Sequence, residues 1–83
     1  MEIAEIINQI NGIIVELFEN DSIVVTSETK AADIDEWDSL IHIKVITAIE
    51  KHFQIRFDMN ELLTFSNIGD LSRDILIKID KKI

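Results

Sequence analysis

The sequence contains no cysteine and no proline, and only two of its 83 residues are glycine. Without cysteine, disulfide scaffolds, thiol chemistry and cysteine-based zinc sites are excluded. The scarcity of proline and glycine disfavours sandwiches and barrels, which need many tight turns. No apolar run approaches the ~20 residues that a membrane span needs, and Met1–Glu5 lack the positive charge of a signal peptide. We therefore expect a protein of the cytoplasm.

Hydrophobic residues, by contrast, make up 47% of the chain, and 18 residues are isoleucine. This content is too high for a disordered segment, and the length predicts one domain over residues 1–83. A small domain without disulfides depends on its core alone, which favours well-packed helices. We expect it to act as a monomer.

Acidic residues outnumber basic ones by 16 to 8, and the excess lies in the first half of the chain. Residues 1–41 hold ten acids and one base, whereas residues 42–83 hold six acids and seven bases. The net charge of −8 disfavours nucleic acids and anionic membranes as partners. The densest acidic run, residues 33–38, is either a solvated loop or a docking surface for a basic protein.

Hydrophobic periodicity predicts an all-α fold, a four-helix bundle of three longer helices and one short helix. The first helix covers residues 2–19. The second starts at Asp38 or Ser39, with Asp38 as its N-cap, and ends near Phe53. The last helix follows Ser66, which we expect to be its cap.

The short helix and a long loop complete the predicted fold. A start resembling a capping box predicts a short helical turn over residues 58–63. Residues 20–38 show no sustained helical period and form a long loop between helices one and two. We expect Ile23–Val25 and Ile34 to insert from this loop into the helical core. A loop of this length is more often functional than decorative.

The second helix has a core face and a second apolar patch outside it. At about 100° per residue, one arc collects the core residues. These are Ile41, Val45, Ile46, Ala48, Ile49 and Phe53. Leu40 and Ile43 fall instead on the polar side with Thr47, one turn apart and next to the acidic loop. This patch suggests a contact surface for a partner.

Ser39 stands in the first turn of this helix, where backbone N–H groups point outward and the dipole is positive. A phosphate attached to its hydroxyl would be favoured there, although such a serine can also be a simple cap. A hydrolase is disfavoured because no acid is placed to orient His42 and no nucleophile elbow is present. A calcium-binding EF-hand loop is disfavoured as well. Counted from Asp33, its sixth position, which requires glycine, would be Asp38. We interpret Trp37, the only tryptophan, as an anchor for the chain entering the helix.

The triplet Asp38-Ser39-Leu40, after an acidic loop and before an apolar helix, resembles the attachment motif of acyl carrier proteins. The strings Glu36–Ile41 and Ala48–Phe53, followed by Ile55 and Phe57, are similar to the second helix of that family. Chain length, acidity, the long first loop and the order of helices match as well. The resemblance therefore covers nearly the whole chain.

This resemblance implies a non-enzymatic carrier with a 4′-phosphopantetheine cofactor. A phosphopantetheinyl transferase would transfer the group from coenzyme A to Ser39, beside Asp38, and the thiol of the arm would carry an acyl group as a thioester. The reactive sulfur thus comes with the cofactor. Leu40, Ile43 and Thr47 match the stripe that the family presents to partners. Those partners are acyl-transferring or synthase enzymes with basic docking surfaces, which Asp35 and Glu36 would also contact.

The sequence departs from the family pattern at two places. Glu36 stands where many members have glycine, and Ile41 and Lys44 stand where carriers of primary fatty acid synthesis usually have acids. The acidic recognition surface has thus moved into the loop before Ser39, which suggests a carrier dedicated to a specialised biosynthetic pathway. The alternative is an unmodified acidic helical adaptor that binds a basic protein through residues 33–38.

Overall fold

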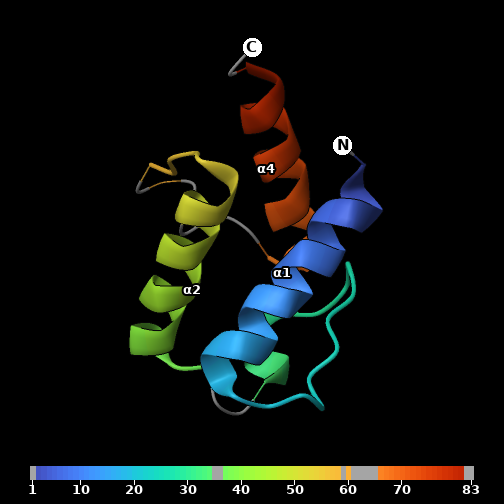
Figure 1. The fold of residues 1–83 in the computed structure, drawn as a ribbon, viewed down its shortest axis with the longest axis vertical. Coiled ribbons are helices and arrows are strands. Elements are labelled where there is room, and N and C mark those ends of the chain that lie inside the picture. Colours follow the sequence, from blue (N-terminus) through green and yellow to red (C-terminus); the bar gives the residue numbers. More distant parts are fainter. Residues whose placement is uncertain (1, 35–36, 59, 61–65, 82–83) are drawn as a thin grey trace.

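The computed structural model describes residues 2–34, 37–58, 60 and 66–81. These residues form three α-helices and one 3₁₀ turn, without any strand (Figure 1). The helices are α1 (Ile3–Phe18), α2 (Ser39–Phe53) and α4 (Ile68–Lys81), and the turn η1 covers Ala31–Asp33. The predicted all-α fold is confirmed. The short helix expected over residues 58–63 lies mostly outside the described residues.

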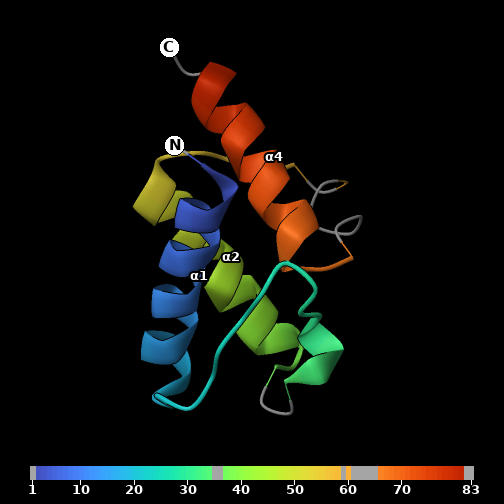
Figure 2. The ribbon, with the colours of Figure 1, turned by 90° about the vertical axis from the view of Figure 1, so that its right-hand side faces the viewer.

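Helix α1 is the central element and packs against both α2 and α4 (Figures 1 and 2). It starts as a capping box, in which the N–H of Glu2 donates to the Glu5 carboxylate at 3.2 Å. Ile6, Ile10 and Ile14, spaced one turn apart, are completely buried. These isoleucines thus form the core face of α1.

Helices α2 and α4 complete the core with the same kind of side chain. The fully or nearly fully buried residues that they contribute are Val45, Ile46, Ile49, Phe53, Ile68, Leu71 and Ile75. Mostly branched aliphatic side chains fill this interior, because each helix buries one apolar stripe against its neighbour. Within the part of the chain that is described, no helix is long and apolar enough to cross a membrane.

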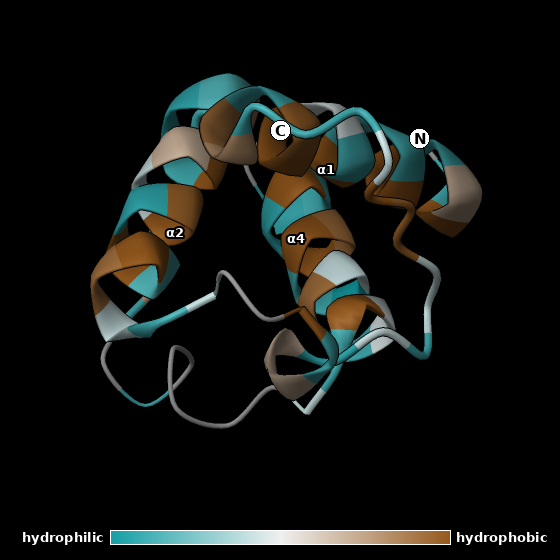
Figure 3. Cartoon of the chain, turned by 90° about the horizontal axis from the view of Figure 1, so that it is seen from below, coloured by the Kyte–Doolittle hydropathy of each residue, from teal (hydrophilic) through white to brown (hydrophobic). Residues whose placement is uncertain are grey.

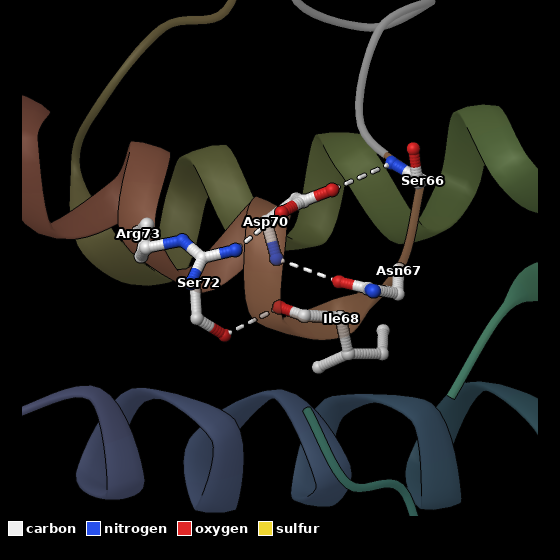
Figure 4. Close-up of polar contacts among 6 residues, drawn as sticks. All are labelled: Ser66, Asn67, Ile68, Asp70, Ser72 and Arg73. Carbon is white, nitrogen blue, oxygen red and sulfur yellow. Dashed lines mark hydrogen bonds and ion pairs between the residues drawn. The ribbon is translucent and has the colours of Figure 1, made fainter. Parts of the chain in front are cut away.

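The start of α4 differs from the prediction that Ser66 is its cap. The side chain of Asn67 accepts from the backbone N–H of Asp70 at 2.9 Å, so Asn67 is the capping residue (Figure 4). The N–H of Ser66 instead donates to the Asp70 carboxylate at 3.3 Å. The helix also buries one hydroxyl, that of Ser72, which donates to the Ile68 carbonyl at 2.7 Å.

The loop between α1 and α2 is attached to the helices at several points. Val25 is buried and its N–H donates to the Asn11 side chain at 2.6 Å. Ile23 and Ile34 are partly buried against the core, as predicted. Val24 is 75% exposed, so the prediction that it inserts into the core is wrong. The side chains of an extended segment alternate in direction, which is why Val24 points away from the core when its neighbours point in.

Candidate functional site

Ser39 is the first residue of α2 and is exposed to solvent. The residue before it, Asp38, has extended backbone and accepts the Ile41 N–H on its carboxylate at 2.8 Å. Its carbonyl accepts the N–H of His42 at 2.9 Å, which closes the first helical turn. The predicted N-cap is therefore confirmed. The cap holds the Ser39 hydroxyl at the positive end of the helix dipole, in contact with water.

Trp37 fixes the chain where it enters α2. Its ring meets that of Phe18 edge-on, with 5.9 Å between centroids, and this contact ties the entry point to the end of α1. Its indole N–H donates to Nδ1 of His42 at 3.1 Å. Trp37 is partly buried, so its predicted role as an anchor is confirmed. The sequence did not reveal this hydrogen bond, which makes His42 a partly buried partner of Trp37 and not the exposed residue that a lone helical histidine suggests.

Beyond Ser39, α2 presents apolar side chains to solvent. Leu40 is 69% exposed and Ile43 is 63% exposed, and Thr47 on the next turn is exposed as well. In Figure 3, brown (hydrophobic) segments alternate with teal (hydrophilic) ones along the first turns of α2. Ile41, by contrast, is only partly exposed and packs against the core. Because Leu40 and Ile43 are this exposed, they add little to the stability of the folded chain. They are suited to contact with a partner protein.

Two predicted partner-binding residues, Asp35 and Glu36, lie outside the described residues. Of the acids described just before them, Asp33 is exposed and accepts the Lys30 N–H at 3.0 Å. Among the residues that the structure describes, no group of histidine and acidic side chains could hold a metal ion. His52, at the far end of α2, contacts Gln9 of α1 at 2.6 Å and so links the two helices.

Taken together, the first turn of α2 offers a solvent-exposed serine and a helix end that favours negative charge. A phosphodiester on Ser39 would lie close to the outward-pointing amides of this turn. The exposed apolar pair would stand beside it. Near Ser39, the Asp38 carboxylate accepts the Ile41 N–H and Nδ1 of His42 accepts the Trp37 indole N–H.

Comparison with known proteins assigns this arrangement to a family. The family model described as the phosphopantetheine attachment site matches residues 2–75. The chain therefore belongs to the phosphopantetheine-attachment family, and it is a carrier protein whose prosthetic group is phosphopantetheine.

One solved structure supports the assignment at the level of the whole fold. The chain is similar to the solution structure of a holo acyl carrier protein from Geobacter metallireducens, with 41% sequence identity and a TM-score of 0.85. The match covers 92% of this chain and 87% of the other. The search of curated proteins found no match. The predicted fold and its resemblance to acyl carrier proteins are thus confirmed.

Proposed function

We propose that Ser39 is the residue to which the phosphopantetheine group is attached. The observation that carries this proposal is the position of its hydroxyl, exposed on the first residue of α2. Asp38 supports the site by holding the first turn through its bond to the Ile41 amide. The cap keeps the outward amides and the hydroxyl in one fixed arrangement, so that a transferase meets a preformed site.

The chemistry that follows is a phosphoryl transfer. The Ser39 oxygen attacks the phosphorus that bears the pantetheine chain of coenzyme A, the phosphoanhydride bond breaks, and adenosine 3′,5′-bisphosphate leaves. The hydroxyl proton goes to a base of the transferase, because the carrier itself contributes only the nucleophile. Once attached, the arm supplies a thiol that carries an acyl group as a thioester. Residues 1–83 then form one carrier domain, which is not itself an enzyme.

Partners would recognise α2 and the loop before it. Leu40, Ile43 and Thr47 present an exposed stripe beside Ser39. Asp35 and Glu36 belong to the acidic run that we propose meets basic residues of a transferase or synthase. The absence of acids at positions 41 and 44 supports a carrier dedicated to a specialised biosynthetic pathway, and we place it in the cytoplasm with coenzyme A.

The direct experiment is to incubate the purified protein with coenzyme A and a broad-specificity phosphopantetheinyl transferase and then measure its mass. We expect one adduct in the wild type and in Ser66→Ala, because Ser66 is also exposed but lies outside α2. We expect none in Ser39→Ala. An adduct that persists in Ser39→Ala would contradict the assignment of the site. An unchanged wild-type mass with several transferases would favour the unmodified acidic adaptor.

A further inference from the structure

The solvent side of α2 carries two exposed lysines, whereas its one acid, Glu50, is only partly exposed. Five exposed residues of this helix form what we call the α2 strip. They are Leu40, Ile43, Lys44, Thr47 and Lys51. At about 100° per residue they share one arc of roughly 100° along the helix. A partner that lies along α2 would therefore contact the apolar pair and both lysines at once.

Glu50 is the one acid in the sequence of α2, and its carboxylate is engaged elsewhere. It accepts the backbone N–H of Phe57 at 2.9 Å, beyond the end of the helix. Its side chain is only partly exposed and lies at the edge of the strip. This bond holds the chain that leaves α2, so Glu50 has a structural use and its carboxylate is directed to the Phe57 amide beyond the end of the helix.

The two lysines of the strip form no salt bridge with a residue that the structure describes. The salt bridge found among the described residues joins Arg73 and Asp70 on α4. Lys44 and Lys51 take no part in it, and both are exposed. Asp38, the nearest acid at the start of α2, uses its carboxylate on the Ile41 amide. The strip therefore presents two lysine charges around an apolar patch.

We propose that the partner enzyme docks on the α2 strip through an apolar pocket flanked by carboxylates, one facing each of Lys44 and Lys51. This rests on the proposed function, since it names the partner of the same surface. Basic residues of that partner would meet only the acidic loop before Ser39. The partner surface is thus divided in charge, acidic over α2 and basic over the loop, and this division determines specificity by repelling enzymes that are basic throughout.

A membrane is the competing occupant for an apolar and basic surface. The net charge of −8 opposes approach to an anionic bilayer, and the strip is a single short helix face with two lysines. A protein partner, which can place single carboxylates opposite single lysines, fits the observations better. Binding to vesicles is therefore an outcome of the test and not part of the proposal.

The test compares two forms of one phosphopantetheinyl transferase, chosen for a basic docking surface, with the second form carrying glutamates in place of its docking bases. The carriers are the wild type, Lys44→Glu/Lys51→Glu, and the control Arg73→Glu/Lys81→Glu on α4. The control changes net charge equally at exposed residues away from the strip. The measured quantity is kcat/KM for loading of Ser39 at low salt.

We expect the Lys44→Glu/Lys51→Glu variant to be loaded about tenfold faster than the wild type by the basic form and about tenfold slower by the acidic form. Both effects should shrink as salt is added, because exposed charges are screened. The control should behave as the wild type within about twofold. Equal effects in both double variants would overturn the proposal, because they would reflect net charge and not the strip.

Failure of the proposed function and failure of the strip proposal give different results. All three carriers should be loaded to completion by a broad-specificity transferase, which shows that they fold. If none is loaded, the proposed function fails before the strip is tested. If all are loaded but the charge preference is absent, only the strip proposal fails. Co-sedimentation of the wild type with phosphatidylglycerol vesicles, lost in Lys44→Glu/Lys51→Glu, would also overturn it in favour of a membrane.

Discussion

Asp38 and Ser39 divide two tasks at the start of α2. The Asp38 carboxylate satisfies the backbone of the first turn, and the next residue keeps its hydroxyl in solvent. If Ser39 itself were the N-cap, its oxygen would be held by backbone amides and would be a poorer nucleophile for a transferase. The aspartate at the cap position therefore leaves the serine in solvent, where the proposed attachment can take place.

Removing this cap should weaken the fold. Asp38→Ala leaves the Ile41 amide without its acceptor, and we expect the free energy of unfolding to fall by about 1 kcal/mol in urea denaturation. Asp38→Asn keeps an acceptor oxygen and should retain most of the stability. Equal stability of Asp38→Ala and the wild type would contradict the role of the cap.

Asp70 provides a test at low pH. A hydrogen bond from the Arg73 guanidinium, followed by one from the Ser66 amide, lowers the pKa of the Asp70 carboxyl below its usual value. Because the folded-state pKa is the lower one, Asp70 contributes stability above the unfolded pKa of about 3.9 and loses it as pH falls through the folded pKa. The difference in unfolding free energy between the wild type and Asp70→Asn should stay constant above about pH 5 and diminish below about pH 4. A difference that is the same at every pH would contradict this.

Single residues were predictable where their role is local. The Asp38 cap follows from residue type and spacing alone, because a cap bonds to an amide only three residues away. The choice of Asn67 over Ser66 as the cap of α4 could not be made in this way, since both residue types cap helices well. Nor could the bond from Trp37 to His42 be predicted, because it depends on the path of the loop.

At the scale of elements, the first loop and α4 complete one another. The first amides of α4 have no partner within the helix. The loop supplies two: the Ile68 N–H donates to the Thr29 carbonyl and the Gly69 N–H to the Ser27 carbonyl, each at 2.8 Å. The loop thus closes the end of α4 while it leads the chain toward Ser39.

The two glycines should respond to alanine in opposite directions. A Cβ at Gly69 would lie 2.8 Å from the Ser27 carbonyl oxygen, whereas one at Gly12 of α1 would meet nothing within 4 Å. We expect Gly69→Ala to lower the free energy of unfolding by about 1–3 kcal/mol through forced separation of loop and helix. Gly12→Ala should raise it by about 0.8 kcal/mol, because alanine favours the helix. The same denaturation assay serves both, and a stabilised Gly69→Ala would contradict the close approach.

The existence of the three long helices was predictable because each shows its own apolar stripe. The packing of the first loop against the helices was only partly predictable. Ile23, Val25 and Ile34 were expected to insert because apolar side chains avoid water, and they do. Val24 has the same chemistry but faces solvent, and the bonds of Ser27 and Thr29 to α4 are made by backbone groups that every residue possesses. Contacts of this kind cannot be predicted from residue types.

For the whole molecule, the dominant feature is the uneven charge. The chain carries −8, and its first 41 residues hold ten of the 16 acids. Glu16 and Glu19 add to the electrostatic repulsion, because they stand at the negative end of the α1 dipole. A domain of this size must therefore stay folded against the repulsion between its own acidic side chains.

Salt should stabilise the protein. Between about 50 mM and about 500 mM salt, screening should raise the melting temperature by about 5 °C. Glu16→Gln/Glu19→Gln should melt higher than the wild type at low salt and respond less to added salt, because two repulsive charges are gone. A melting temperature independent of salt in the wild type would show that self-repulsion is unimportant.

Attachment of the arm to Ser39 can be measured on a single peptide. Cleavage after Lys30 and Lys44 releases residues 31–44, a peptide in which Ser39 is the only hydroxyl-bearing residue. Tandem mass spectrometry of this peptide, from protein isolated from its native cells, should find the mass of phosphopantetheine, with or without an acyl load, on Ser39. An unmodified 31–44 peptide together with the same added mass on any other peptide of the chain would contradict the account.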